Sequence, residues 1–148
     1  MLNVIFHCDQ GMITKIDLEA SQGKTDWKII SNKKDAVLEK MIDSWMEDYA
    51  KCKQPKVQLP LDLDALPAYT KRILAALREI PFGKTATYQE LAIKTKNPRA
   101  ARAVGNACGR NPFPLIIPCH RIIKSDGGLG GFAFGTTLKK ALLAYEQI

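Results

Sequence analysis

The segment from residue 51 to residue 67 most constrains the fold, because it interrupts the regular patterns on either side of it. It carries Pro55, Pro60 and Pro67, and its apolar residues keep neither a helical nor a strand period. Proline fixes φ and removes a backbone donor, so such a segment favours a connector. We therefore expect a small lobe over residues 1–60, a connector to about residue 67, and a second lobe over residues 66–148.

Charge changes sign across this connector. Residues 1–67 carry a net charge of −2, whereas residues 68–148 carry a net charge of +9. A positive field suits a polyanion such as nucleic acid, although a solvated face of lysines is the ordinary alternative.

Two features bear on location. No apolar stretch approaches the roughly 20 residues of a membrane helix. Residues 1–6 lack the basic region and small-residue cleavage site of a signal peptide. We expect a soluble, non-secreted protein with no membrane partner, cytoplasmic or, in a eukaryote, nuclear.

The first lobe has the patterns of an α/β unit. Residues 2–7 and 12–18 alternate as strands around a turn at residues 9–11, and residues 27–30 favour a third strand. These strands predict a short antiparallel sheet. Residues 34–49 predict an amphipathic helix whose stripe is more typical of a core than of a cofactor site; the stripe consists of Val37, Leu38, Met41, Ile42, Trp45 and Tyr49.

The four cysteines are Cys8, Cys52, Cys108 and Cys119, and they show no C-x-x-C spacing. This argues against a disulfide framework or a zinc knuckle. A zinc site built from His7, Cys8 and Cys52 is an alternative, but structural zinc usually takes four ligands in close pairs, so we expect no metal.

The second lobe contains signals for several helices. Apolar spacing predicts a helix over residues 69–80, and Thr87-x-x-Glu90 is a capping box. Asn97 and Pro98 have the residue types of an N-cap and a first helical position, ahead of a helix over residues 99–108. Two short helices joined by a tight turn predict a helix-turn-helix.

The helix over residues 99–108 is rich in alanine and glycine, so its backbone can approach a groove floor closely. Arg99, Arg102 and Asn106 would project from one face, and an arginine could enter a base stack. The alternative is a slim helix packed tightly against a neighbour, with solvated arginines.

Cys119 and His120 follow Pro118 and the apolar run of residues 115–117, which favours a strand. A cysteine reacts as thiolate, and a nearby imidazole can remove its proton. Adjacent side chains diverge in an extended chain, so a bridging water would be required. The pair alone leaves a reactive thiol and a buried structural one equally open.

The remaining chain is a glycine-rich segment at residues 125–135 and a final helix. Thr136 or Thr137 is expected to cap this helix, with Leu138, Ala141, Leu142 and Tyr145 inward. Glu146 ends it, where a carboxylate opposes the helix dipole. Glu146 could orient His120 or be a solvated terminal residue, and spacing alone favours the solvated residue.

Several of these features coincide in one known family. The relevant segments are Tyr88–Ala92, Asn97–Gly105, Asn111–Pro112, Ile117–Arg121 and Leu142–Glu146. In them, residues 66–148 resemble the methylated-DNA–protein-cysteine methyltransferases, also called O6-alkylguanine-DNA alkyltransferases. The resemblance implies an α+β protein whose mostly helical catalytic lobe is similar to a winged helix-turn-helix.

The resemblance also implies a single-turnover reaction in which O6-alkylguanine is flipped from duplex DNA and its alkyl group moves irreversibly to a cysteine. Cys119 would accept the alkyl group, and His120, oriented by Glu146, would deprotonate it through a water. Asn111 would be the hinge beside the thiol, and Tyr88 would lie near the target phosphate and offer its hydroxyl to guanine N3. The alkyl donor is the DNA, so no cofactor is implied.

DNA contacts in the minor groove are implied as well, with Arg102 filling the vacated stack and a monomer expected. The implied DNA-binding set is Tyr88, Arg99, Ala101, Arg102, Asn106, Arg110 and Arg121. The implied guanine pocket takes the carbonyls of Cys119 and Ile122, the amide of Ala133, and the side chains of Phe132 and Phe134.

The chain departs from the family pattern in three places. Many members carry tyrosine and serine where this chain has Phe132 and Ala133, and a small residue where it has Phe134. The first lobe matches only loosely. The alternatives are a non-catalytic alkyltransferase-like lesion sensor, which Cys119 argues against, and a helix-turn-helix regulator.

Overall fold

The computed structural model describes residues 1–97 and 99–147. The chain divides into two compact units, residues 1–64 and residues 65–148. None of the helices described is long and apolar enough to cross a membrane.

The first unit is a three-stranded sheet in the order β2-β1-β3. Its elements are β1 (Leu2–Asp9), β2 (Met12–Ala20), β3 (Asp26–Ser31) and α1 (Ala36–Ala50). The predicted hairpin is confirmed: Gln10 and Gly11 turn the chain with φ of 50° and 78°, the left-handed values of the tight hairpin turn.

The sheet is mixed, and the prediction that it is antiparallel was wrong for its third strand. β2 pairs antiparallel with β1, whereas β3 pairs parallel with β1, Val4 opposite Trp27. β1 is therefore the central strand. β2 lies on one side of it and runs in the opposite direction, and β3 lies on the other side and runs in the same direction as β1.

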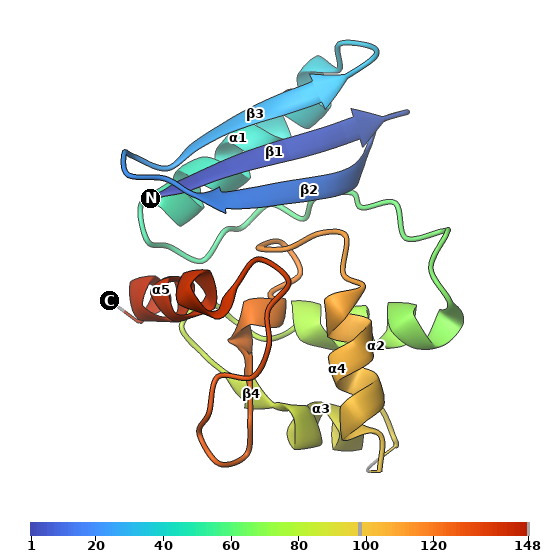
Figure 1. Ribbon diagram of the computed structural model, residues 1–148. Helices are drawn as coiled ribbons and strands as arrows, with labels where there is room; N and C mark the ends of the chain where they lie inside the picture. Colours follow the sequence, from blue (N-terminus) through green and yellow to red (C-terminus); the bar gives the residue numbers. More distant parts are fainter. Residues whose placement is uncertain (98, 148) are drawn as a thin grey trace. The chain divides into compact units, whose positions relative to one another are not determined.

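Helix α1 packs along one face of this sheet (Figure 1). Asp35 caps it by accepting a hydrogen bond from the Leu38 amide at 3.0 Å. Trp27 of β3 donates its indole N–H to Asp43 at 2.9 Å. Val37 is 72% exposed, so its predicted inward position was wrong; the buried residues of α1 are Leu38, Ile42, Trp45, Met46 and Tyr49.

Residues 51–67, all of them described, contain no helix and only a single bridge between Leu61 and Ile13. Leu59 and Leu61 are nevertheless buried. The segment is therefore irregular but packed.

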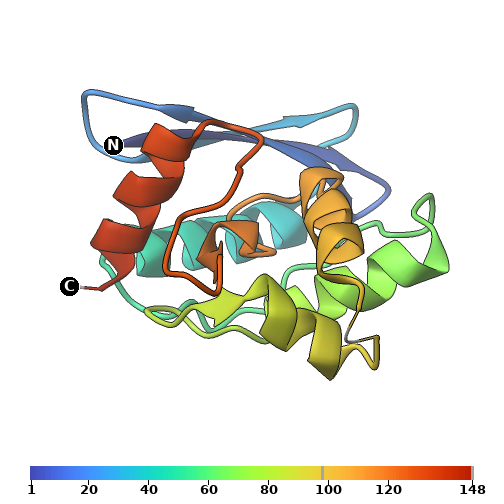
Figure 2. The same ribbon diagram turned by 60° about the horizontal axis from the view of Figure 1, so that its bottom comes forward.

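The second unit is mainly helical. Its elements are α2 (Ala68–Arg78), β4 (Ala86–Thr87), α3 (Tyr88–Lys94), α4 (Ala101–Gly109), the 3-10 turn η1 (Cys119–Arg121), β5 (Ile122–Ile123) and α5 (Thr136–Glu146). Helices α2, α3 and α4 pack on one another, and Figure 2 shows this group from a second side. β4 and β5 form a short parallel pair.

The capping box at the start of α3 is confirmed. The Thr87 hydroxyl accepts from the Glu90 amide at 3.0 Å, and the Glu90 carboxylate accepts from the Thr87 amide at 3.2 Å. Helix α4 begins later than predicted, because Ala100 and not Asn97 is its N-cap. The Asn97 carbonyl instead accepts from the Ala100 amide in a turn. The proposed role of Pro98 lies outside the described residues.

Two further predictions were wrong. Residues 115–117 form a turn and not a strand, with Leu115 at a φ of 75°. Helix α5 has Gly135 as its N-cap, at a φ of 96°, and no threonine side chain caps it. Ala141, expected to be buried, is exposed, whereas Lys139 is buried.

Candidate active site

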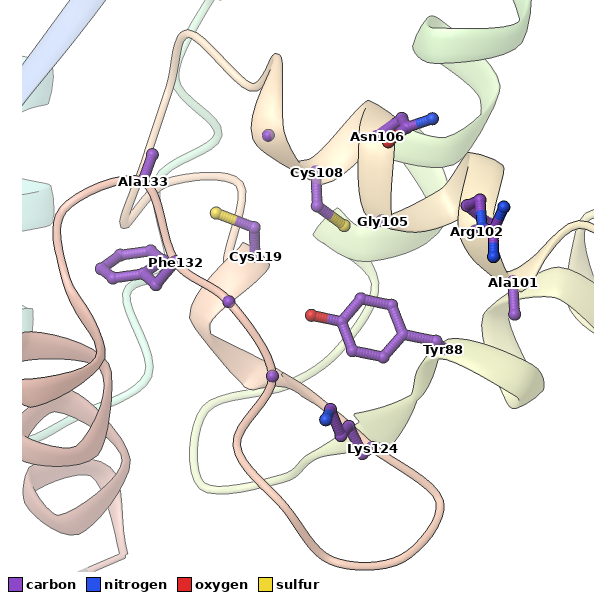
Figure 3. Close-up of a pocket in the computed structure, with 13 residues that line it drawn as sticks. Tyr88, Ala101, Arg102, Gly105, Asn106, Cys108, Cys119, Lys124, Phe132 and Ala133 are labelled. Atoms are coloured by element: carbon purple, nitrogen blue, oxygen red, sulfur yellow. The ribbon is translucent and has the colours of Figure 1, made fainter.

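Cys119 is the first residue of the turn η1, and its side chain faces a cavity (Figure 3). The turn before it is closed by hydrogen bonds from the Ile117 amide to the Phe113 carbonyl and from the Cys119 amide to the Ile117 carbonyl, at 2.9 and 2.8 Å. Only 8% of Cys119 is exposed. The thiol is therefore held in a rigid turn with little access to water except through the cavity.

Asn111 connects the end of helix α4 to this thiol. Its side-chain amide nitrogen donates to the Ile117 carbonyl at 2.9 Å and lies 3.4 Å from the Cys119 sulfur. Its side-chain oxygen accepts from the Phe113 amide at 2.9 Å. A donor aimed at the sulfur favours the thiolate over the thiol.

His120, Glu146 and Arg121 form a buried group beside Cys119. One Glu146 oxygen lies 2.6 Å from His120 Nε2, and the other accepts from Arg121 Nε at 2.6 Å. Arg121 Nη1 also donates to the Ile80 carbonyl at 2.7 Å. Burial alone would raise the pKa of Glu146, but His120 and Arg121 outweigh it and bring the pKa to about 2.

This arrangement determines which imidazole nitrogen carries the proton. Glu146 is ionised and can only accept, so Nε2 of His120 must donate. Burial lowers the pKa of His120, more than the hydrogen bond and charge of Glu146 raise it. The resting imidazole is therefore neutral with a basic Nδ1, and among the residues that the structure describes Nδ1 is buried with no hydrogen-bond partner.

The thiol itself is not acidic in the resting site. Burial raises the pKa of Cys119, and this outweighs the opposing effects of the Asn111 hydrogen bond and the Lys139 charge. The neighbouring Cys108 has its pKa raised to about 12, mainly by burial and then by the charge of Cys119. A base is therefore needed to generate the Cys119 thiolate.

The cavity has a volume of about 560 Å³. Helix α4, Tyr88 of α3, Cys119 and the glycine-rich loop form its walls (Figure 3). Its lining residues are Tyr88, Ala101, Arg102, Gly105, Asn106, Cys108, Gly109, Cys119, Lys124, Gly130, Gly131, Phe132 and Ala133. The lining residues that are described include no carboxylate, and the volume is in the range of small-molecule sites.

Comparison with known proteins identifies the family of this chain. The family model described as "6-O-methylguanine DNA methyltransferase, DNA binding domain" matches residues 68–148, which is more than half of the chain. The chain belongs to this family.

Named relatives extend the match. A methylated-DNA–protein-cysteine methyltransferase of Methanosarcina barkeri is 52% identical over 79 residues, which cover 53% of this chain and 50% of the relative. One from Haemophilus influenzae is 51% identical over 81 residues, covering 55% and 45%. The matched part thus spans about half the length of these curated relatives.

Solved structures of the 6-O-methylguanine DNA methyltransferase family share the fold. Mycobacterium tuberculosis OGT in complex with DNA is 28% identical with a TM-score of 0.78, covering 98% of this chain and 92% of that one. The Pyrococcus kodakaraensis enzyme is 23% identical with a TM-score of 0.68 over the full length of both chains. The predicted mixed α and β fold class is confirmed by this similarity.

The structure brings seven of the site residues predicted from the family to one cavity. Cys119, Tyr88, Arg102, Ala101 and Asn106 line it, as do Phe132 and Ala133. Ile122 and Phe134 do not line it. Ile122 is fully buried, and the Phe134 ring packs on Phe132 with ring centres 5.7 Å apart.

The predicted DNA-binding arginines divide into three groups. Arg102 is exposed at the cavity, whereas Arg99 and Arg110 are exposed near the two ends of α4 and do not line it. Arg121 is 4% exposed and is hydrogen bonded to Glu146 and Ile80. Its predicted DNA contact was therefore wrong.

The alternative of a zinc site built from His7, Cys8 and Cys52 has no matching cluster in the structure. No cluster of three metal-binding side chains exists among residues 1–97 and 99–147. His7 instead pairs with Asp17 at 2.8 Å.

Three residues with ionisable side chains at the site were not predicted. Cys108 and Lys124 line the cavity, and Lys139 is buried behind it, donating to the Gly131 carbonyl. The period of α5 placed Leu138 and Leu142 inward and so also allowed an inward Lys139. Lysine side chains are normally exposed to solvent, so the helical period alone did not predict that Lys139 is buried.

Proposed function

We propose that this chain repairs O6-alkylguanine, mainly O6-methylguanine, in duplex DNA by transferring the alkyl group irreversibly to Cys119. The observation that carries the proposal is the Cys119 sulfur, which faces a 560 Å³ cavity beside a buried His120–Glu146 pair. The net charge of +9 over residues 68–148 supports sequence-independent binding to phosphates.

The reaction begins with loss of the thiol proton from Cys119 to His120 Nδ1 through a bridging water. Glu146 stabilises the imidazolium that forms, because its carboxylate lies 2.6 Å from Nε2. Asn111 donates toward the sulfur at 3.4 Å and stabilises the thiolate. Together these groups offset the burial that opposes ionisation.

The thiolate then attacks the alkyl carbon on the side opposite guanine O6. A carbon–sulfur bond forms as the carbon–oxygen bond breaks, and the electron pair remains on the guanine. Tyr88, which lines the cavity, donates its hydroxyl proton toward N3 and limits the developing negative charge. The guanine anion takes up one proton, which balances the proton that Cys119 gave to His120, so the products are guanine and an S-alkylcysteine. A thioether is a poor alkyl donor, so each chain reacts once.

Access to the base requires flipping, which costs a few kcal/mol and least for a poorly paired lesion. We place α4 in the minor groove, since its small residues Ala101, Gly105 and Gly109 line the cavity mouth. Arg102 enters the stack that the base leaves. A monomer on double-stranded DNA suffices for this reaction.

The direct test is incubation of the protein with duplex DNA containing O6-methylguanine. We expect one methyl group per chain, on the peptide containing Cys119 by mass spectrometry, with loss of the lesion. Lesion binding that leaves both the DNA and Cys119 unmodified would instead support a non-catalytic sensor.

Arg102→Ala should slow repair of duplex substrate by about ten- to a hundredfold, because filling the vacated stack offsets part of the flipping cost. Reaction with free O6-benzylguanine requires no flipping and should fall less. Arg99→Ala is the matched control, as Arg99 is exposed but does not line the cavity; it should weaken salt-dependent DNA affinity alone. Equal losses of Arg102→Ala on both substrates would contradict the role of Arg102.

Gly130→Ala should reduce transfer by about tenfold or more, because misplacing a site by an ångström can cost this much. Gly130 has a φ of 74°, and a Cβ there would lie 2.6 Å from the Tyr88 hydroxyl. Gly127→Ala is the control, since Gly127 also has a positive φ, of 88°, does not line the cavity, and its Cβ would meet none of the described atoms beyond its chain neighbours within 4 Å. The measurement is the rate of methyl transfer to Cys119 for both variants, with melting temperatures to check that both are folded. Equal rates would show that the loop tolerates the added carbon at Gly130.

A further inference from the structure

Lys139 is a buried cation that the proposed reaction does not use. None of its surface is exposed. Its ammonium donates to the Gly131 carbonyl at 3.1 Å and lies 5.9 Å from the centre of the Tyr88 ring. Both Gly131 and Tyr88 line the cavity, so the charge sits directly behind the cavity wall.

No carboxylate pairs with Lys139 within the described part of the chain, where the ion pairs found involve other residues. A buried ammonium without a counter-ion is unfavourable. A carbonyl and an aromatic face compensate it only in part. The position therefore calls for a nearby group that can become negative.

Four ionisable groups interact with the charge of Lys139. They are Cys119 and His120 of η1, Cys108 of α4 and Tyr88 of α3. His120 cannot become an anion, and burial raises the pKa values of Tyr88, Cys108 and Cys119 alike. Cys119 differs from these because Asn111 donates toward its sulfur and His120 stands beside it in sequence.

We propose that Lys139 is a positioning residue that acts as the counter-cation of the Cys119 thiolate and ties the glycine-rich loop at Gly131 to helix α5. This rests on the proposed function for its role in alkyl transfer, but the effect on the thiol requires no DNA. As Cys119 loses its proton, the buried ammonium gains the opposite charge that it lacks at rest. Burial lowers the pKa of Lys139, and the thiols oppose that shift.

The test is the pH dependence of Cys119 alkylation by iodoacetamide in the free protein, followed by mass spectrometry of the Cys119 peptide. Lys139→Gln removes the charge but retains an amide that can donate to the Gly131 carbonyl. Lys139→Met removes both, and Lys139→Arg retains the charge. Lys140→Met is the matched control, because Lys140 is the exposed neighbour on the same helix.

We expect Lys139→Gln and Lys139→Met to raise the midpoint of alkylation by about one pH unit or more, the scale of an opposite charge nearby. Lys139→Arg retains the charge, so its midpoint should stay close to that of the wild-type protein. Lys140→Met should leave the midpoint unchanged. Because Cys119 and His120 can titrate together, the midpoint describes the pair. Methyl transfer near pH 7 should fall about tenfold in the uncharged variants, as one unit implies.

If folded Lys139→Gln had the same alkylation midpoint as the wild-type protein, the proposal would be overturned, and the role of Lys139 would be limited to its contact with the loop. This test holds even if Lys139→Met is unstable. The outcome is separable from that of the proposed function. A midpoint shift without methyl transfer in the wild-type protein would reject the repair activity and retain the ion pair. Methyl transfer by the wild-type protein with no midpoint shift in the Lys139 variants would support the repair activity and reject the ion pair.

Discussion

Cys119→Ser should lower methyl transfer from duplex O6-methylguanine by at least about a thousandfold, the order of loss when a nucleophile is removed. A serine hydroxyl at its ordinary pKa is a far weaker nucleophile than a thiolate. Serine is close to cysteine in size, so the turn closed by Phe113 and Ile117 should persist. The measurement is single-turnover transfer of labelled methyl groups to protein.

Two controls keep this result specific to the sulfur. Lesion affinity of Cys119→Ser should stay within a few-fold of wild type, because the phosphate contacts are unchanged. Cys52→Ser makes the same chemical change at a thiol in the first unit, outside the cavity, and should transfer normally. Methyl transfer by Cys119→Ser at a rate near that of wild type would place the acceptor elsewhere.

Glu146→Gln should both destabilise the protein and slow transfer. The substitution leaves Arg121 buried without its counter-charge, and breaking a buried pair costs about 3–5 kcal/mol. It also replaces the carboxylate that holds the proton on His120 Nε2 with a neutral amide, which offers one oxygen and one NH2 group where His120 and Arg121 each need an acceptor. Urea unfolding and transfer kinetics on the same samples measure the two effects.

The pH dependence of stability gives a second reading of Glu146. Its pKa in the folded protein is about 2, below the ordinary 4.5. Its contribution to stability is therefore complete above pH 4.5 and is lost as the pH falls through about 2. The difference between wild type and Glu146→Gln should shrink over that window.

Glu79→Gln is the matched control for Glu146→Gln. Glu79 pairs with Lys94 at 2.6 Å, but both side chains are more than half exposed, so its loss should change stability by less than about 1 kcal/mol. If the two variants lost equal stability, the buried network around Glu146 would not be the cause.

Local patterns in the sequence predicted the elements whose signals are local. The Thr87–Glu90 capping box and the turn at Gln10 and Gly11 appear as expected. Their hydrogen bonds join residues a few positions apart, so neighbouring side chains suffice to specify them. The family motif likewise predicted that Cys119 and Tyr88 would share a cavity.

Predictions that depend on non-local packing failed, and so did two local ones, the helix caps expected at Asn97 and at Thr136 or Thr137. The strand β3 could lie beside β2 or beside β1, and only packing of the sheet on α1 decides between them. Val37 and Ala141 fit their helical stripes but are exposed. A period identifies a face of a helix but not how wide a part of that face the core covers.

The sequence by itself determined the reactive group, because a cysteine followed by a histidine in this motif specifies the chemistry by residue type. The tertiary structure decided the charges around it. Arg121 turned inward to Glu146, and Lys139 came to rest behind the cavity wall at Gly131. Coulomb energy depends on distance and burial, and neither can be read from the order of residues along the chain.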